Sequence, residues 1–260
     1  MNQDIKEHIR NSLKQGVRLD GRKLDEIRPL SIETGFLSTA EGSAKVKMGD
    51  AEVIAGVKMA IESPFPDTPE DGVLMVNAEL LPLSNPEFEA GPPSIDSIEI
   101  SRVIDRGIRE SKAVNTKALC IEKGEKVWSV SIDVAPINHD GNLLDIGGLA
   151  ALAALKTARF PEVTKDGIDY HKLTDKKLDV LKFPIPVTVC KIGDSLIVDP
   201  TEEEEVAIDA RLTVTSLDKD TVCAMQKGGS KSLTQKEIED MIELALKKGD
   251  EVRKKLGEVN

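Results

Sequence analysis

Three arginines are spaced so that they share one face of a predicted helix. The helix is expected to run from Ser94, a residue type that caps helices, to about Val114. The arginines occupy positions i, i+4 and i+7, which places them on one side of it. They are Arg102, Arg106 and Arg109. Guanidinium groups in such a row can bind successive phosphates of a single nucleic-acid strand. The alternative is a solvated face with local ion pairs, such as Asp105 with Arg109.

A cluster of carboxylates follows the strand that is expected near residues 195–198. Asp199 is followed by Pro200 and Thr201 and then by four glutamates, the last of which is Glu205. Clustered carboxylates can hold a divalent cation or serve as general acid and base. They can equally form an acidic loop that ends the strand. The pattern alone leaves both interpretations open.

A glycine turn precedes another predicted helix, at about residues 143–158. Backbone N–H groups at the start of a helix bind anions, and the turn Asp140-Gly141 leads into such a start. The residues that enter the helix are Leu143 and Leu144, whereas a phosphate site needs polar or cationic side chains. We therefore interpret this segment as the start of a core helix. His139 has no nucleophile near it in the sequence and is interpreted as a structural histidine.

The composition excludes several classes of protein. The chain has 260 residues, of which 40% are hydrophobic and 31% charged, as in globular proteins and unlike disordered chains. The three cysteines and three histidines show no metal-ligand spacing, so we predict buried free thiols in a reducing compartment, no metal and no cofactor. We expect no membrane-spanning helix, because no apolar run is long enough, and the N-terminus lacks a signal-peptide core. A cytoplasmic protein is predicted.

The overall charge argues against a protein that binds nucleic acid without help. The formal net charge is -11 and the isoelectric point is about 4.9, whereas nucleic-acid binders usually have a basic surface. Aromatic residues make up 3% of the chain, so base stacking is not expected to be its main mode of recognition. A local stripe of arginines is compatible with both observations.

The order of the predicted elements indicates an α+β fold with helices packed on mixed sheets. Helices are expected at 1–15, 94–114 and 143–158 and from Thr234 onward, where Thr234 and Glu237 form a capping-box pattern. Strands are expected at 31–36, 42–50, 51–60, 73–81, 117–122, 126–136, 185–191, 195–198, 206–215 and 220–226, with a proline-rich loop at 61–72. The predicted units are an N-terminal helix and extension (1–30), a first domain (31–160), a linker (161–184) and a second domain with a C-terminal helix (185–260).

Five segments, in order along the chain, resemble the RNase PH family. The first, R-L-D-G-R-K-L-D-E-I-R at 18–28, is similar to the family's opening motif R-x-D-G-R-x-x-D-E-x-R. The others are G-S-A-K-V-K-M-G-D (42–50), I-E-I-S-R-V-I-D-R-G-I-R (98–109), D-V-A-P-I-N-H-D-G-N (133–142) and I-V-D-P-T-E-E-E (197–204). The similarity covers about residues 18 to 250. The leading helix and the last segment most resemble the non-catalytic RNase-PH-like subunit of the archaeal exosome.

The resemblance implies both a fold and an assembly. The fold is that of RNase PH, with a first domain built from two β-α units followed by a smaller second domain. The assembly is a hexameric ring of three heterodimers with a catalytic RNase-PH-like subunit, on which S1-domain cap subunits sit. Such a ring threads single-stranded RNA and degrades it from the 3′ end with inorganic phosphate.

Departures from the family pattern imply a role without catalysis. Active members bind the attacking phosphate with a small hydroxyl residue and an arginine, and Leu143 and Leu144 occupy those places here. They also carry a second aspartate where this chain has Glu205, while Asp199 remains. The resemblance therefore implies no catalytic residue in this chain. Arg102 and Arg106 match positions that hold RNA at the neighbouring active site, and Arg109 matches less closely.

Three hypotheses follow. The leading one is a non-catalytic exosome subunit that structures the active site of its catalytic partner and helps bind single-stranded RNA for 3′-to-5′ phosphorolysis. The alternative is an active phosphorolytic 3′-to-5′ exoribonuclease, which would need a phosphate ligand at Leu143 or Leu144. The third is a purely structural ring spacer without RNA contact, against which the arginine stripe argues.

Overall fold

The first sheet is formed by strands from the N-terminal half of the chain. The computed structural model describes residues 2–165 and 167–257. The strand order is β1-β2-β3-β6-β4, and β5 pairs with β6. All pairings are antiparallel except that of β4 with β6, which is parallel. The strands are β1 (Leu30–Thr34), β2 (Gly42–Met48), β3 (Ala51–Glu62), β4 (Val73–Ala78), β5 (Cys120–Glu122) and β6 (Lys126–Asn138).

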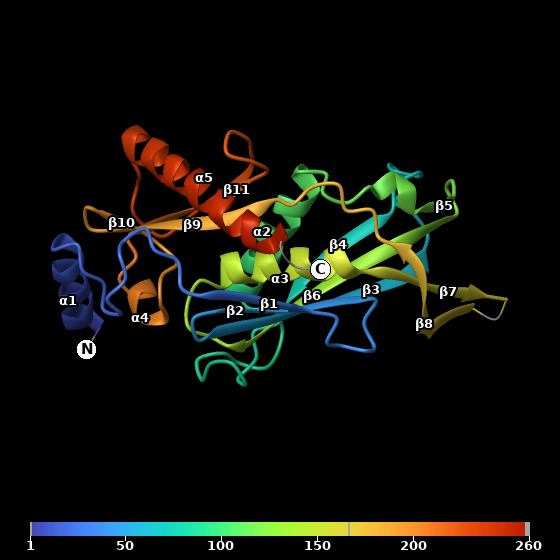
Figure 1. The fold of residues 1–260 in the computed structure, drawn as a ribbon, viewed down its shortest axis with the longest axis horizontal. Coiled ribbons are helices and arrows are strands. Elements are labelled where there is room, and N and C mark those ends of the chain that lie inside the picture. Colours follow the sequence, from blue (N-terminus) through green and yellow to red (C-terminus); the bar gives the residue numbers. More distant parts are fainter. Residues whose placement is uncertain (1, 166, 258–260) are drawn as a thin grey trace.

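The second sheet is formed by strands from the C-terminal half of the chain. It lies over the first sheet, with helix α3 (Leu143–Thr157) between them (Figure 1). Its order is β10-β9-β11-β12, all antiparallel. Helix α5 (Gln235–Gly257) packs on β9 and β11. The strands are β9 (Ile185–Ile192), β10 (Ser195–Val198), β11 (Ala210–Ser216) and β12 (Val222–Gly228).

Helix α3 is the centre of the core because it is apolar on every side. Every residue from Leu143 to Leu155 is buried, as its Ala-, Leu- and Gly-rich sequence predicts. Two glycines let the backbones approach: a Cβ at Gly148 would lie 2.6 Å from Cγ of Pro186, and one at Gly42 would lie 2.4 Å from the Ala154 carbonyl oxygen. One continuous apolar core therefore joins both sheets, and the predicted division into domains stays a prediction.

Helix α2 (Ile95–Glu110) packs on β4, on α3 and on β12. The Ser94 side chain accepts a hydrogen bond from the backbone N–H of Ser97, which confirms the predicted cap. The buried face carries Ile100, Val103, Ile104 and Ile108. The opposite side of this helix is therefore turned outward.

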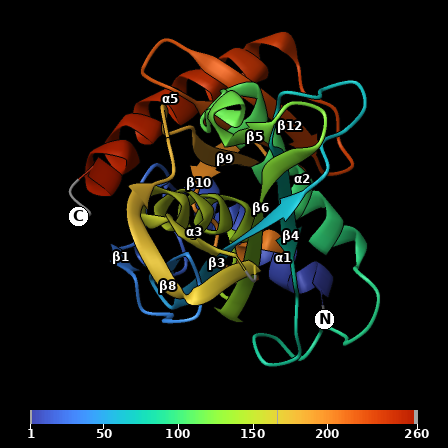
Figure 2. The ribbon, with the colours of Figure 1, turned by 90° about the vertical axis from the view of Figure 1, so that its right-hand side faces the viewer.

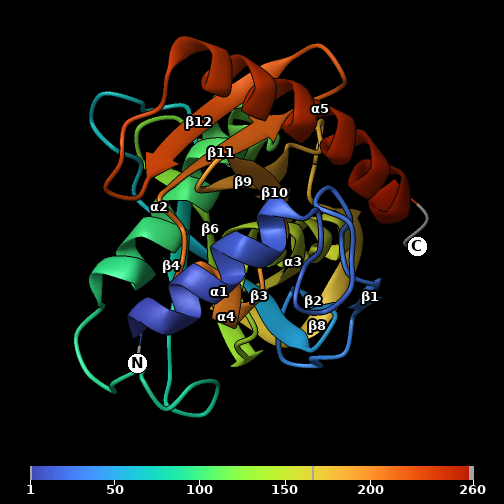
Figure 3. The same cartoon turned by 90° about the vertical axis from the view of Figure 1, so that its left-hand side faces the viewer.

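Helix α1 (Asn2–Lys14) closes one end of the second sheet, and Figure 3 views the molecule from that side. Its Ile9 and Leu13 form a small apolar cluster with residues of β9 and β10, among them Cys190 and Ile197. An ion pair of 2.7 Å between Arg10 and Asp209 adds to this packing. The described part of the chain contains no helix long and apolar enough to cross a membrane.

Three expectations about the elements were wrong. The segment 161–184 was predicted to be a linker, but most of it belongs to the hairpin of β7 (Arg159–Thr164) and β8 (Gly167–Lys177). This hairpin projects from the end of the molecule that faces the reader in Figure 2. Residues Thr116–Leu119 form the 3-10 helix η1 rather than a strand. The strand expected from 206 begins only at Ala210, after the short helix α4 (Glu202–Glu205) and a turn.

The prediction for the three cysteines is confirmed only in part. All three cysteines are free, as predicted, but only Cys190 is buried, while Cys120 and Cys223 are partly exposed. The N-terminal helix, the β2–β3 hairpin and the capping box of α5 are confirmed.

Candidate functional site

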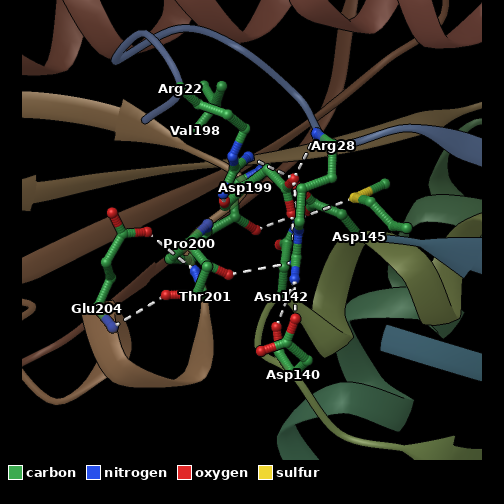
Figure 4. Close-up of polar contacts among 12 residues, drawn as sticks. Arg22, Arg28, Asp140, Asn142, Asp145, Val198, Asp199, Pro200, Thr201 and Glu204 are labelled. Carbon is green, nitrogen blue, oxygen red and sulfur yellow. Dashed lines mark hydrogen bonds and ion pairs between the residues drawn. The ribbon is translucent and has the colours of Figure 1, made fainter. Parts of the chain in front are cut away.

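The carboxylate of Asp199 lies at a junction of three segments (Figure 4). Its residue is 1% exposed. Arg28 binds it through both the side chain and the backbone N–H, at 2.7–2.9 Å. Nη1 of Arg22 donates to it at 2.8 Å, and Nδ2 of Asn142 donates at 3.0 Å. The arginines hold the pKa of Asp199 below its ordinary value of 3.8, although burial acts in the opposite direction.

A second buried ion pair lies beside the first. Arg18, which is 1% exposed, binds the carboxylate of Glu204 through Nε and Nη2. Its guanidinium also donates to the backbone carbonyls of Val198 and Asp199, at 2.9 and 2.8 Å. Glu204 in turn closes the capping box of α4 with Thr201. Through the guanidinium of Arg18, the opening motif of the chain is thus bound to the acidic segment about 180 residues later.

The contacts at this junction indicate the role of Asp199 and Glu204 in the acidic segment. Asp199 and Glu204 are structural, because guanidinium and backbone groups already occupy their oxygens. No group of three or more His, Cys, Asp or Glu side chains that could hold a metal occurs among residues 2–165 and 167–257. For Asp199 and Glu204 these contacts favour the structural acidic segment over the cation or acid–base site considered from the sequence.

The start of α3 lies against the same segment. A Cβ at Gly141, whose φ is +80°, would lie 2.4 Å from the Pro200 carbonyl oxygen, so only glycine permits this approach. Asn142, with φ of 59°, is the N-cap of the helix, and its backbone N–H donates to Oε1 of Glu205 at 2.8 Å. Nε2 of His139 lies 3.8 Å from Oε2 of Glu205.

A cavity of about 330 Å³ opens beside this helix start. Leu143 and Leu144 line it together with Ile100 from α2 and Ile208. Its charged lining residues are Asp96, Glu99, Glu205 and Arg211. Arg211 already pairs with Glu99 at 2.6 Å. No guanidinium in this lining is therefore left without a carboxylate partner.

Glu205 and His139, which line this cavity, have shifted pKa values. Burial raises the pKa of Glu205 to about 7, although about a third of its side-chain surface reaches solvent. Burial lowers the pKa of His139 below 6.5, so the imidazole is neutral at pH 7. The ring of His139 packs at 5.3 Å from Phe88, but its buried Nδ1 has no hydrogen-bond partner in the described structure, so its structural role stays a prediction.

The three predicted RNA-binding arginines do not share one environment. Arg102 and Arg106 are exposed on α2, and neither forms a hydrogen bond or ion pair with any other residue in the described part of the chain. Arg109 is bound by the carboxylate of Asp105 at 2.6 and 3.1 Å. Its Nη2 also donates to the Leu74 carbonyl of β4 at 2.9 Å. The local ion pair considered from the sequence exists, but it engages only the last arginine.

Sequence reasoning missed the roles of Arg18, Arg22 and Arg28. Arg18 and Arg22 are spaced i, i+4, but their segment forms turns rather than a helix, and the partners of all three arginines lie more than 170 residues away. The one available signal was charge complementarity between an arginine-rich segment and an acidic one. That signal does not specify which carboxylate pairs with which guanidinium.

Two family models match the chain. Residues 26–161 match the model described as 3′ exoribonuclease family, domain 1, and residues 182–248 match domain 2 of the same family. Together they cover most of the chain.

The chain is also similar to curated exosome components and to chains of solved exosome structures. The chain is 44% identical to "Exosome complex component Rrp42" of Methanopyrus kandleri, over 96% of this chain and 95% of that protein. It is 48% identical to the protein of the same name from Thermococcus gammatolerans, over 96% and 93%. A solved structure described as "archaeoglobus fulgidus exosome with RNA bound to the active site" contains a chain with a TM-score of 0.91 and 42% identity, at 98% coverage of both chains.

Proposed function

This chain belongs to the RNase PH family of 3′ exoribonucleases, and we propose that it is the non-catalytic, RNA-holding subunit of an archaeal-type exosome. Its curated relatives carry the name of an exosome component, and its structural neighbours are archaeal exosome chains. The proposed work is to structure the active site of a catalytic partner and to position the RNA that the partner degrades.

The start of α3 carries the proposal that this subunit performs no phosphorolysis. An attacking phosphate dianion needs charged or polar ligands in a dry site. Leu143 and Leu144 stand at the helix start, and the carboxylate of Glu205 accepts a hydrogen bond from the backbone N–H of Asn142 just before it. Asp199 is held in the arginine junction and is not free to act as acid or base.

Arg102 and Arg106 support the proposed contact with RNA. One helical turn separates them, and the buried isoleucines of α2 fix the helix beneath them. An exposed guanidinium without a carboxylate partner is free to bind a phosphate of a strand that passes over α2. Arg109 contributes less in this proposal, because Asp105 and the Leu74 carbonyl already occupy it.

The proposed partners follow from the same family. We infer a ring of three heterodimers with a catalytic RNase-PH-like subunit, S1-domain cap subunits on one face of that ring, and single-stranded RNA threaded through it, in the cytoplasm. The acidic net charge of -11 fits a chain that provides one local RNA contact within a larger assembly.

The test is phosphorolysis of a single-stranded RNA by three samples: this chain, the catalytic partner, and the two mixed. Release of nucleoside diphosphates is measured with and without inorganic phosphate. We expect no release by this chain alone and the fastest release by the mixture, which should elute as a hexamer. Phosphate-dependent release by the pure chain would instead favour the alternative of an active exoribonuclease.

A further inference from the structure

The cavity between the starts of α2 and α3 has the size and the walls of a small-molecule site. Its volume of about 330 Å³ lies at the lower end of the range for cavities that hold small ligands. The apolar part of its wall is formed by Leu80, Phe88, Ile100, Leu143, Leu144 and Ile208. The proposed function assigns no ligand to this cavity, so its polar groups indicate what it can bind.

Two residues of the lining carry buried side-chain atoms without a hydrogen-bond partner in the described structure: Nδ1 of His139 and Oδ1 of Asn142. The amide of Asn142 is oriented by Asp199, which accepts a hydrogen bond from Nδ2 at 3.0 Å, so the remaining atom is the oxygen. Nε2 of His139 faces the carboxylate of Glu205 at 3.8 Å, which favours the proton on Nε2 and leaves Nδ1 as an acceptor. Because buried polar groups are almost always paired, these two acceptors call for a donor that the described chain does not supply.

The charged side chains of the lining favour a cation. Asp96, Glu99 and Glu205 contribute carboxylates, whereas the guanidinium of Arg211 is bound by Glu99 at 2.6 Å. The carboxylate of Asp96 forms no hydrogen bond or ion pair in the described part of the chain. These acids are not arranged for a metal ion, since no metal-binding group of three or more His, Cys, Asp or Glu side chains occurs among the described residues. Carboxylates spread along an apolar wall fit an organic cation better than a metal ion.

We propose that this cavity binds a small aliphatic ammonium cation, with its N–H groups toward the carboxylates and its alkyl chain against Leu143 and Leu144. An ammonium group has three N–H donors and no acceptor, so it complements a lining rich in acceptors. The two leucines suit the alkyl chain, because removing apolar surface from water is favourable. Such a group belongs either to a free amine or to a lysine side chain of a neighbouring subunit. Only the second source rests on the proposed function.

The test is an NMR titration of the isolated chain with n-butylamine at pH 8 and low salt, read from the backbone amide shifts. At this pH an alkylamine is protonated, as lysine is. We expect saturable shifts at Leu143 and Leu144 with n-butylamine, but none with 1-butanol or butyrate, which have the same alkyl length without the positive charge. Asp96→Asn and Glu205→Gln should each weaken binding about fivefold, because each removes one negative charge and keeps an acceptor. Glu203→Gln, an exposed neighbour in α4 outside the cavity, is the matched control and should change nothing.

Three results overturn the proposal: no saturable shift with n-butylamine, equal affinity for 1-butanol or butyrate, or a loss in Glu203→Gln as large as in the two cavity variants. The last result would mean that the amine is only a counter-ion of the acidic surface. Circular dichroism checks folding, and the exposed Asp96→Asn decides alone if Glu205→Gln does not fold. Repeating the titration with the mixed complex separates the two sources: binding that persists in the ring identifies a free amine, and binding lost there identifies a group of the neighbouring subunit. None of these results bears on phosphorolysis or the RNA contact, which the mixing experiment tests separately.

Discussion

Two groups of arginines in this molecule have opposite surroundings. Arg18, Arg22 and Arg28 are enclosed at the junction between the chain's opening segment and α4, where carboxylates and carbonyls take up their donors. Arg102 and Arg106 extend from α2 without partners in the described structure. The residue type is the same, so its role is set by whether acids from elsewhere in the fold face it. The first group should matter for folding and the second for binding.

The largest effect is expected from breaking the enclosed group. Arg18→Ala leaves the buried Glu204 without a cationic partner, and such a change typically costs about 3–5 kcal/mol. Arg28→Ala should cost less, because Arg22 still binds Asp199. The free energy of unfolding in urea measures both.

The control for this comparison is Arg102→Ala, which removes an exposed arginine of α2. A substitution there should change stability by no more than about 0.5 kcal/mol. If Arg18→Ala and Arg102→Ala destabilise the protein equally, the distinction between the two groups is wrong.

The second effect concerns binding. Replacing both Arg102 and Arg106 by Glu in the assembled complex should weaken RNA binding at least tenfold, since a hydrogen bond to a charged group contributes about 1.5–3 kcal/mol before screening. Losing two phosphate contacts should also reduce the slope of log affinity against log salt by about 1.4. RNA affinity and decay rate at several salt concentrations measure both quantities.

Lys254→Glu is the control for that experiment, because Lys254 is exposed near the C-terminal end of α5, and Figure 3 shows that end of the helix on the opposite side of the molecule from α2. Unchanged affinity and rate in an intact ring contradict the RNA contact. Loss of the ring, checked by light scattering, assigns these arginines to a subunit interface instead.

The third effect is the acid sensitivity of the enclosed group. The arginines lower the pKa of Asp199 in the folded state below 3.8, so this group adds stability above about pH 4 that is lost as the pH falls below it. Unfolding free energies between pH 2.5 and 6 should fall at the acidic end. In Asp199→Asn, which has no charge to lose, that fall should be shallower; an identical profile would show that Asp199 does not titrate in this range.

Asp145 provides a contrast to Asp199, because its effect on stability should have the opposite dependence on pH. It is fully buried under Thr188, and burial raises its pKa to about 7. An acid with a raised pKa in the folded state loses stability as the pH rises from about 4 to about 7. The two carboxylates lie in the same core but are governed by different neighbours: arginines for Asp199, and amide and hydroxyl groups for Asp145.

The sequence predicted those elements whose signals are local. Ser94 and the spacing of the isoleucines placed α2, and the uniformly apolar α3 was expected to be buried. The hairpin of β7 and β8 was missed because most of its residues are exposed and of mixed charge, so no apolar alternation marks it. Pro161 also breaks its register.

The candidate site was predicted only where it depends on nearby residues. From Leu143 and Leu144 the sequence predicted a poor phosphate site, and in the structure these residues line a cavity in which the guanidinium of Arg211 is paired with Glu99. The carboxylate of Asp199 is bound by Arg28, which is 171 residues away in the sequence. The carboxylate of Glu205 is bound by the backbone N–H of Asn142. Such pairings are set by tertiary packing, which residue spacing does not encode.

The smallest effect separates Arg109 from its two neighbours on α2. Arg109 is engaged by Asp105 and the Leu74 carbonyl, so a phosphate would have to compete with contacts that already exist. In the assembled complex, Arg109→Ala should therefore weaken RNA binding less than Arg102→Ala does. Asp105→Asn should cost only about 0.3–0.5 kcal/mol of stability, as expected for an exposed i,i+4 pair. It should also raise RNA affinity slightly, because it releases a guanidinium and removes a negative charge. A loss for Arg109→Ala as large as that for Arg102→Ala would mean that all three arginines act as one RNA-binding row.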